Sequence, residues 1–143
     1  MANITRFAIA MERRGEEVER GTIFAMQKGA LAIGTALVMS TPVLTGNARG
    51  NWQMSLGLPA DKEIGRLDPS GATTIAAMTG VVSQMRPGGG LSSRVFITNN
   101  VPYIAKLNAG SSPQAAAGWV ERAVIAGSAA VEGVGGQLFR RRF

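Results

Sequence analysis

One long helical pattern near the N-terminus constrains the fold of this chain more than any other feature. Apolar or small residues recur there at steps of three and four positions. They are Ile4, Phe7, Met11, Val18, Thr22, Ala25, Gly29, Ile33, Ala36 and Leu37. Such steps place side chains on one face of an α-helix. A helix of about 35 residues would be ~50 Å long, so part of it is expected to project from the domain.

The two halves of this helix differ in charge. The first half carries Glu12, Arg13, Glu16 and Arg20 opposite the apolar face, whereas residues 23–39 are apolar almost all round. A helix that is apolar on every side is buried on every side. We therefore expect the first half to lie on a surface or against a neighbouring subunit, and the second half to pack across a sheet.

Gly15 and Pro42 are expected to interrupt and to end this helix. A glycine inside a helix costs about 1 kcal/mol relative to alanine, so Gly15 marks the expected break or kink. Pro42 disfavours helix in the residue before it and lacks a backbone donor. The uncharged part of the helix, residues 29–39, is about half of the ~20 residues that cross a bilayer. Because residues 1–22 are also unlike a signal peptide, we expect a soluble, unprocessed protein.

The rest of the chain shows short strand and helix patterns. Strands are expected at residues 51–58 and 94–98, a loop at 59–71, helices at 73–85 and 113–130, and a short helix or turn at 101–109. Ser70 or Thr73 is expected to cap the second helix, and Ser112 the last one, with Pro113 at its first position. These elements predict an α+β fold, in which a small antiparallel sheet packs against the long N-terminal helix and two or three shorter helices.

The chain length indicates one domain, since about 100–150 residues is the commonest domain size. We expect residues 1–143 to form it, with residues 1–22 as a projecting helical segment and residues 131–143 as a C-terminal arm. Glycine-rich loops are expected at Gly46 and Gly50, at residues 88–90 and at residues 133–136.

The formal charge of +6 suggests an anionic partner such as nucleic acid. Near the N-terminus, however, arginine and glutamate alternate. The one undiluted basic cluster is Arg140, Arg141 and Arg142, next to the apolar Phe143. These arginines are candidates for contact with DNA or with a neighbouring protein.

Several kinds of chemistry are excluded by composition. The chain has no histidine and no cysteine, which removes histidine-based triads, thiol nucleophiles and the usual zinc sites. No lysine follows a glycine, so a phosphate-binding loop of the Walker type is absent. Asp61, Glu63 and Asp68 are the remaining candidate acids, in a polar loop that is expected to be solvated. We therefore expect no catalytic residue, no metal and no cofactor.

Two segments carry recognisable motifs. Residues 41–52 read TPVLTGNARGNW, and residues 97–115 read ITNNVPYIAKLNAGSSPQA. In order and spacing, and with a long helix before them, they resemble the tail-completion or neck proteins of tailed bacteriophages, which include minor tail protein Z-like proteins. The chain departs from the family pattern at Leu44, Asn108 and Ala116, where aspartate, glutamate and proline are common.

This resemblance implies a structural virion protein of the phage neck. Such a protein forms a homo-oligomeric ring, expected to be a hexamer, that completes the tail and joins it to the head connector around the DNA channel. Its implied partners are copies of itself, head-connector or stopper proteins, and the tail terminator or tail tube. DNA would pass through the lumen without sequence-specific binding, no membrane would be involved, and assembly would take place in the cytoplasm of the bacterial host. A tail terminator that caps the tube and a basic DNA-binding module remain alternatives.

The motif residues also have structural explanations of their own. Pro42 and Gly46 are expected to reverse the chain between helix and strand, Arg49 and Asn51 to bind loop carbonyls, and Trp52 to anchor the strand. Beside these explanations stands an interface role for some of the motif residues. The candidate structural or interface residues are Thr41, Pro42, Thr45, Gly46, Arg49, Asn51, Trp52, Asn99, Asn100, Pro102 and Tyr103.

Overall fold

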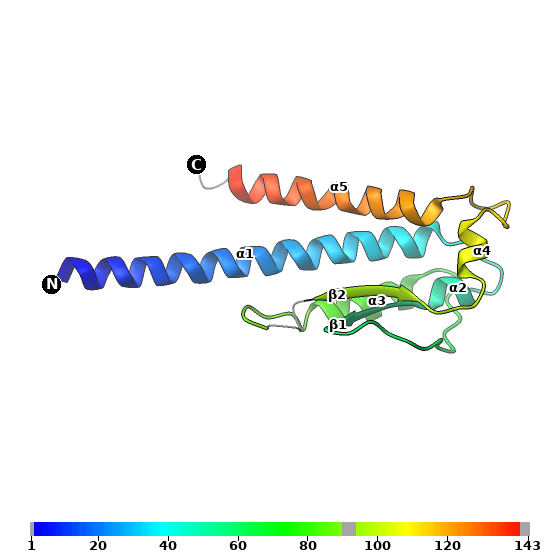
Figure 1. Cartoon of the computed structure of the whole chain (residues 1–143), viewed down its shortest axis with the longest axis horizontal. Coiled ribbons are helices and arrows are strands. Elements are labelled where there is room, and N and C mark those ends of the chain that lie inside the picture. Colours follow the sequence, from blue (N-terminus) through cyan, green and yellow to red (C-terminus); the bar gives the residue numbers. More distant parts are fainter. Residues whose placement is uncertain (1, 90–93, 141–143) are drawn as a thin grey trace.

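The computed structural model describes the backbone of residues 2–89 and 94–140, and the side chains of residues 6, 8–89 and 94–130. In chain order its elements are α1 (Ala2–Ser40), α2 (Asn47–Gly50), β1 (Trp52–Leu56), α3 (Ala72–Val82), β2 (Val95–Asn99), α4 (Ile104–Asn108) and α5 (Trp119–Arg140). Figure 1 shows α1 in the middle, with α5 on one side and the strands with α3 on the other. The predicted α+β fold is confirmed.

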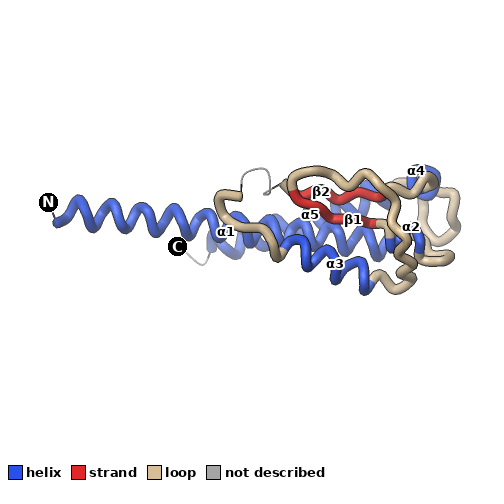
Figure 2. The backbone as a smooth tube through the Cα atoms, turned by 90° about the horizontal axis from the view of Figure 1, so that it is seen from below, coloured by secondary structure: helices blue, strands red, loops and turns tan. Residues whose placement is uncertain are grey.

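Helix α1 is a single helix of 39 residues, about 58 Å long at 1.5 Å per residue. It extends well beyond the rest of the molecule at its N-terminal end (Figures 1 and 2), as the periodicity predicted. The expected break at Gly15 was wrong, because the helix continues through this residue. A Cβ atom added at Gly15 would meet nothing within 4 Å, so no packing contact bends the helix at this point.

The second half of α1 forms the centre of the core. Leu37 and Val38 are 3% and 0% exposed, in one cluster with Trp52, Met54 and Met78. Burying an aliphatic side chain of this size stabilises the fold by about 1.5–3 kcal/mol. The expectation that this half is buried on every side is confirmed only in part, because Phe24, Met26 and Met39 are 45%, 36% and 53% exposed. Its neighbours are α5 and α3 as well as the sheet.

The sheet consists of β1 and β2, which pair antiparallel with Trp52 opposite Asn99 and Leu56 opposite Val95. Trp52 and Met54 are buried, as the alternating pattern predicted. The expected strand was too long at its end, since Leu58 is 78% exposed. Gly57 adopts a φ of 83° and turns the chain after Leu56.

Helix α5 starts six residues later than expected and ends ten residues later. The predicted start at Pro113 with Ser112 as cap was wrong, because Gly118 has a φ of 79° and separates a turn from the helix. Asn108 supplies the cap instead: its Oδ1 accepts a hydrogen bond from the backbone of Val120 at 2.9 Å. The expected glycine-rich loop at residues 133–136 lies inside α5, so the predicted C-terminal arm is helical as far as Arg140.

Helices α1 and α5 approach each other closely at Gly127, because glycine has no side chain to hold the helices apart. A Cβ atom added at Gly127 would lie 2.5 Å from Cα of Ile33, so the two backbones are nearly in contact. By length and composition alone, residues Ala8–Ser40 would be able to cross a bilayer. Because Leu37 and Val38 of the same segment occupy the core, we interpret it as the central helix of the domain. The absence of a membrane partner stays a prediction.

Candidate functional site

The two motif segments lie together at one end of the molecule. Asn99 Nδ2 donates to the carbonyl of Ala48 at 2.8 Å, and Asn47 Nδ2 donates to the hydroxyl of Tyr103 at 2.9 Å. These bonds join residues about fifty positions apart in the sequence. The fold therefore brings both motifs into one hydrogen-bonded unit, which we call the motif end: residues 41–52 and 97–115 with the loop at residues 59–71.

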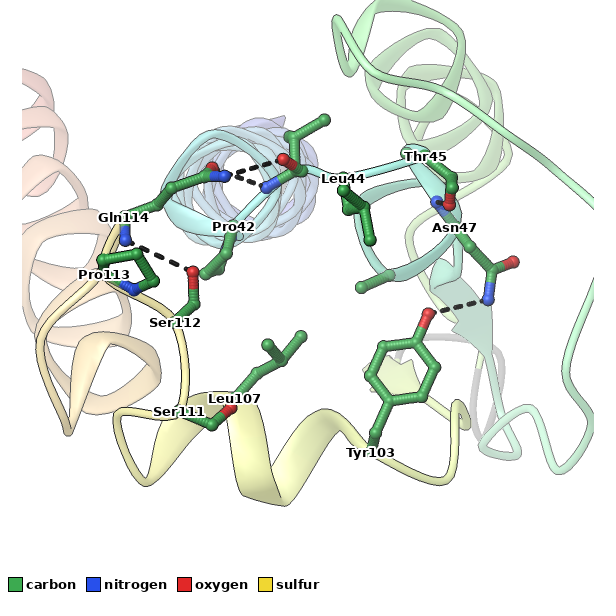
Figure 3. A pocket seen from close by; sticks show the side chains of 13 residues that line it. Pro42, Leu44, Thr45, Asn47, Tyr103, Leu107, Ser111, Ser112, Pro113 and Gln114 are labelled. Atoms are coloured by element: carbon green, nitrogen blue, oxygen red, sulfur yellow. Dashed lines mark hydrogen bonds between the residues drawn. The ribbon is translucent and has the colours of Figure 1, made fainter.

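Gln114 makes the third connection between the two motifs. Its side-chain carbonyl accepts from the backbone N–H of Val43 at 2.8 Å, and its amide donates to the carbonyl of Val43 at the same distance (Figure 3). One side chain thus satisfies both backbone groups of a residue in the turn after α1. An amide is the side chain that can donate and accept in this way.

Thr41 links the end of α1 to the sheet. Its hydroxyl donates to the carbonyl of Leu37 at 2.7 Å and accepts from Nε1 of Trp52 at 2.8 Å. Thr41 is 1% exposed and Trp52 is 5% exposed. Trp52 packs edge-to-face on Trp119, with the ring centres 6.4 Å apart. Both tryptophans therefore belong to the core.

Arg49 and Asn51 bind backbone carbonyls, as the sequence predicted. The Arg49 guanidinium donates to the carbonyls of Pro69, Thr41 and Met39 at 2.7, 2.9 and 3.3 Å. Asn51 is 0% exposed, and its Nδ2 donates to the carbonyl of Asn47 at 2.8 Å. These bonds fix the turn between α1 and β1, because the carbonyls would otherwise lack partners.

The loop at residues 59–71 is fastened to β1. Asn51 Oδ1 accepts from the backbone of Ile64 at 2.7 Å, and Arg66 donates to the carbonyls of Gly50 and Trp52 at 2.8 and 3.2 Å. Asn100 donates to the carbonyl of Ala60 at 3.0 Å. The loop has few apolar residues, yet its backbone is held along most of its length.

The remaining motif residues shape the turns. Gly46 has a φ of 86°, and a Cβ atom there would lie 2.5 Å from the backbone nitrogen of Pro69, so a larger residue would not fit. The Thr45 hydroxyl accepts weakly from the backbone of Asn47 at 3.3 Å. Pro42 is buried, whereas Pro102 is exposed and Tyr103 is 41% exposed. Pro102 and Tyr103 therefore have exposed surface for a neighbour.

A pocket of about 420 Å³ lies between the two motifs. The residues that line it are Pro42, Val43, Leu44, Thr45, Gly46, Asn47, Ala48, Tyr103, Leu107, Ser111, Ser112, Pro113 and Gln114. Figure 3 shows the side chains of Leu44 and Leu107 directed toward this open space. Leu44 is 96% exposed. The lining carries no charged side chain, which suits an uncharged protein surface better than a phosphate or a metal.

The three candidate acids are not brought together as a catalytic group. Asp68 is 5% exposed, and its carboxylate accepts from the backbone and hydroxyl of Thr74 at 2.8 and 2.7 Å and from the backbone of Gly71 at 3.1 Å. It therefore caps α3, whereas Asp61 and Glu63 are exposed. The expected solvated position of Asp68 was wrong, and so was the expected cap by Ser70 or Thr73, since Gly71 occupies the cap position.

The charge of Asp68 is maintained by its partners. Burial raises the pKa of this carboxyl, but the hydrogen bonds from Thr74, Ser70 and Gly71 outweigh burial and hold the pKa below its usual value. Within the described part of the chain, no group of three acidic, histidine or cysteine residues is placed to hold a metal ion.

The structure describes only one residue of the candidate basic cluster Arg140, Arg141 and Arg142. Arg140 is the last residue of α5, while Arg141 and Arg142 lie outside the described residues. Their contact with DNA or with a neighbouring protein therefore stays a prediction.

Three polar residues of the motif end were not singled out from the sequence: Asn47, Arg66 and Gln114. Asp68 was a candidate acid, but its role as a cap was not predicted. Arg66 and Gln114 bind the backbone of segments distant in sequence, and Asn47 donates to the side chains of Glu63 and Tyr103. Such contacts depend on where the chain folds back. Comparison with protein-family models, curated proteins and solved structures found no match for this chain.

Proposed function

We propose that this chain is a non-enzymatic structural subunit of the neck of a tailed bacteriophage. It forms a ring, with six copies to match a sixfold tail, and this ring completes the tail and joins it to the head connector around the DNA channel. In the virion it contacts head-connector or stopper proteins on one side, and the tail terminator or tail tube on the other. Capping of the tail tube as a terminator is the closest alternative.

The observation that supports this proposal best is the contact between the two motif segments. Their residues were singled out by resemblance to neck proteins, and they meet through Asn99 with Ala48, Asn47 with Tyr103 and Gln114 with Val43. Residues that are joined by hydrogen bonds in the folded chain are expected to occur together in a family motif. The projecting half of α1 adds an extended surface that does not pack against the rest of its own domain.

Purified virions provide the direct test. We expect the protein in the particle neck as a ring, visible by electron microscopy of virions, and as an oligomer of defined mass in mass photometry of the purified protein. The position of the ring, directly below the head connector or at the end of the tail tube, distinguishes tail completion from tail termination. A strictly monomeric protein that is absent from virions would contradict the proposal.

Two variants test the other functional classes. Replacement of Asp61 by asparagine with Glu63 by glutamine removes the exposed acids without touching the helix cap at Asp68, and we expect infectivity to be unchanged. Deletion of residues 140–143 tests the DNA-binding alternative, because binding through arginines weakens steeply with salt and with loss of positive charge. Loss of infectivity in the first variant would support an enzyme, and loss of DNA retention in the second a DNA contact.

A further inference from the structure

The apolar side of α1 that packs on α5 continues beyond the end of α5. Residues Met11, Gly15, Val18, Thr22, Ala25 and Gly29 follow one another at alternating steps of four and three. Such spacing forms a seam along one side of a helix, as in coiled coils. Gly29 is buried, and Ile33, about one helical turn further on, lies against Gly127 of α5.

Farther toward the N-terminus the same seam has no cover within the described structure. Met11 and Val18 are 56% and 61% exposed, and nothing lies within 4 Å of a Cβ atom added at Gly15. Figure 1 shows α1 extending well past the end of α5. An apolar seam that is covered over one half of a helix and bare over the other half indicates a partner for the bare half.

The charges beside the seam indicate what this partner is. In heptad terms Met11 and Val18 take one seam position and Gly15 and Thr22 the other, so Glu12 and Glu19 flank the seam on one side and Arg14 flanks it on the opposite side. All three side chains are exposed. Acidic residues on one flank and a basic residue on the other match a second helix with the same sequence.

The orientation follows from the same charges. When two copies run parallel, Arg14 of one copy lies beside Glu19 of the next, five positions later, which is the usual pairing between flanks. When they run antiparallel, each flank meets the same flank of the other copy, so the acidic flank with Glu12 and Glu19 would face itself, and so would the flank with Arg14. Like charges repel across such a contact, so the flanks favour the parallel arrangement.

We propose that residues 11–22 of α1 associate with the same segment of a second copy of this chain, in parallel and in register, through Met11, Gly15 and Val18 with Arg14 beside Glu19. This inference rests on the proposed function and deepens it, because it names the surface where neighbouring subunits meet. Parallel packing places all domains at the same end of the helices, as a closed ring with cyclic symmetry requires.

Single cysteines test the register directly, since the native chain has no cysteine. We expect Met11→Cys and Val18→Cys, each in the full-length protein, to form disulfide-linked dimers under mild oxidation. In a parallel, in-register pair each cysteine lies beside the same cysteine of the other copy, so both variants cross-link. In an antiparallel pair at most one of the two positions can lie beside itself, and a register with Met11 opposite Val18 would cross-link only a mixture of the two variants. Cross-linking only in the mixture would overturn the proposal.

Charge reversal tests the flanks. We expect Arg14→Glu and Glu19→Arg to weaken self-association about tenfold each, and the double variant to recover most of the loss. Arg13→Glu and Glu16→Arg are matched controls, because they change the same charges outside the seam flanks and should leave association unchanged. Circular dichroism checks that every variant remains folded.

The results also separate this inference from the neck proposal. A ring in virions that neither cysteine cross-links, and that tolerates all charge reversals, would overturn the inference and leave the neck proposal standing. Parallel cross-linking by a protein that is absent from virions would support the inference and contradict the neck proposal. A protein that is monomeric at every concentration and fails to cross-link would overturn the inference.

Discussion

The motif end and the projecting half of α1 use similar residues for opposite purposes. At the motif end, Asn51 is fully buried and Arg49 binds three carbonyls. Along residues 8–20 of α1 every side chain is exposed, and charged residues point to solvent. The first region is held by its own chain, whereas the second depends on α-helical propensity and on whatever it contacts in an assembly.

This difference shows how to tell residues that keep the fold from residues available for a partner. Glycine makes the contrast clear. Gly50 is enclosed by the loop at residues 59–71, and Gly15 is surrounded by open space. A substitution of the same chemistry should therefore destabilise the first region and leave the second intact or more stable.

The largest effect is expected for Gly50→Ala. The added Cβ atom would overlap the carbonyl oxygen of Arg66, and backbone cannot move aside as a side chain can. We expect the free energy of unfolding to fall by about 3 kcal/mol or more, measured by urea denaturation. Gly80→Ala is the control, since Gly80 also lies in a helix but has nothing within 4 Å. Equal stability of the two variants would contradict the enclosed position of Gly50.

Asp68→Asn should have the next largest effect. It removes a charged acceptor of hydrogen bonds from Thr74 and Gly71, and we expect a loss of about 2–3 kcal/mol at pH 7. Exposed Asp61→Asn is the control and should change little.

The pH dependence of Asp68 follows from its lowered pKa. The stabilisation is present above the pKa of an unfolded aspartate, about 4, and is lost as the pH falls through the lower pKa of the folded state. The difference between Asp68→Asn and the native protein should therefore shrink below about pH 4 in urea denaturation. A difference that stays constant down to pH 2 would contradict this role of the charge.

A smaller effect is expected for Thr41→Val. The substitution keeps the volume but leaves the indole N–H of Trp52 without its acceptor, and an unsatisfied buried donor costs about 1–3 kcal/mol. Thr22→Val is a close control, since Thr22 also donates to the carbonyl four residues earlier but is exposed. Thermal denaturation followed by circular dichroism compares the two, and a similar loss in both would argue against the bond to Trp52.

The smallest effect, with the opposite sign, is expected for Gly15→Ala. Alanine lowers the backbone entropy of the unfolded chain and has room at this position, so helicity should rise and α1 should gain about 0.5–1 kcal/mol. Far-ultraviolet circular dichroism at low protein concentration measures the change. A decrease in helicity would indicate that Gly15 needs its conformational freedom.

Residues with a strong local preference were predictable. The period of α1, the alternation through Trp52 and Met54, and the stop before Pro42 depend on neighbours close in sequence. The carbonyl-binding roles of Arg49 and Asn51 were also predictable, because a turn after a helix leaves acceptors that a nearby long polar side chain can reach. The start of α5 was not predictable, because Asn108 lies eleven residues before Trp119 and caps it only in the folded chain.

The sequence by itself determined the long helix, the class of fold and the absence of histidine and cysteine chemistry, since these depend on periodicity and residue type. Only the tertiary structure decided that Asp68 is a buried cap, that Gln114 completes the turn at Val43, and that the apolar seam of α1 is covered over one half alone. The physical reason is that hydrogen bonds and burial join residues distant in sequence, whereas helical and strand periodicity arises from residues a few positions apart.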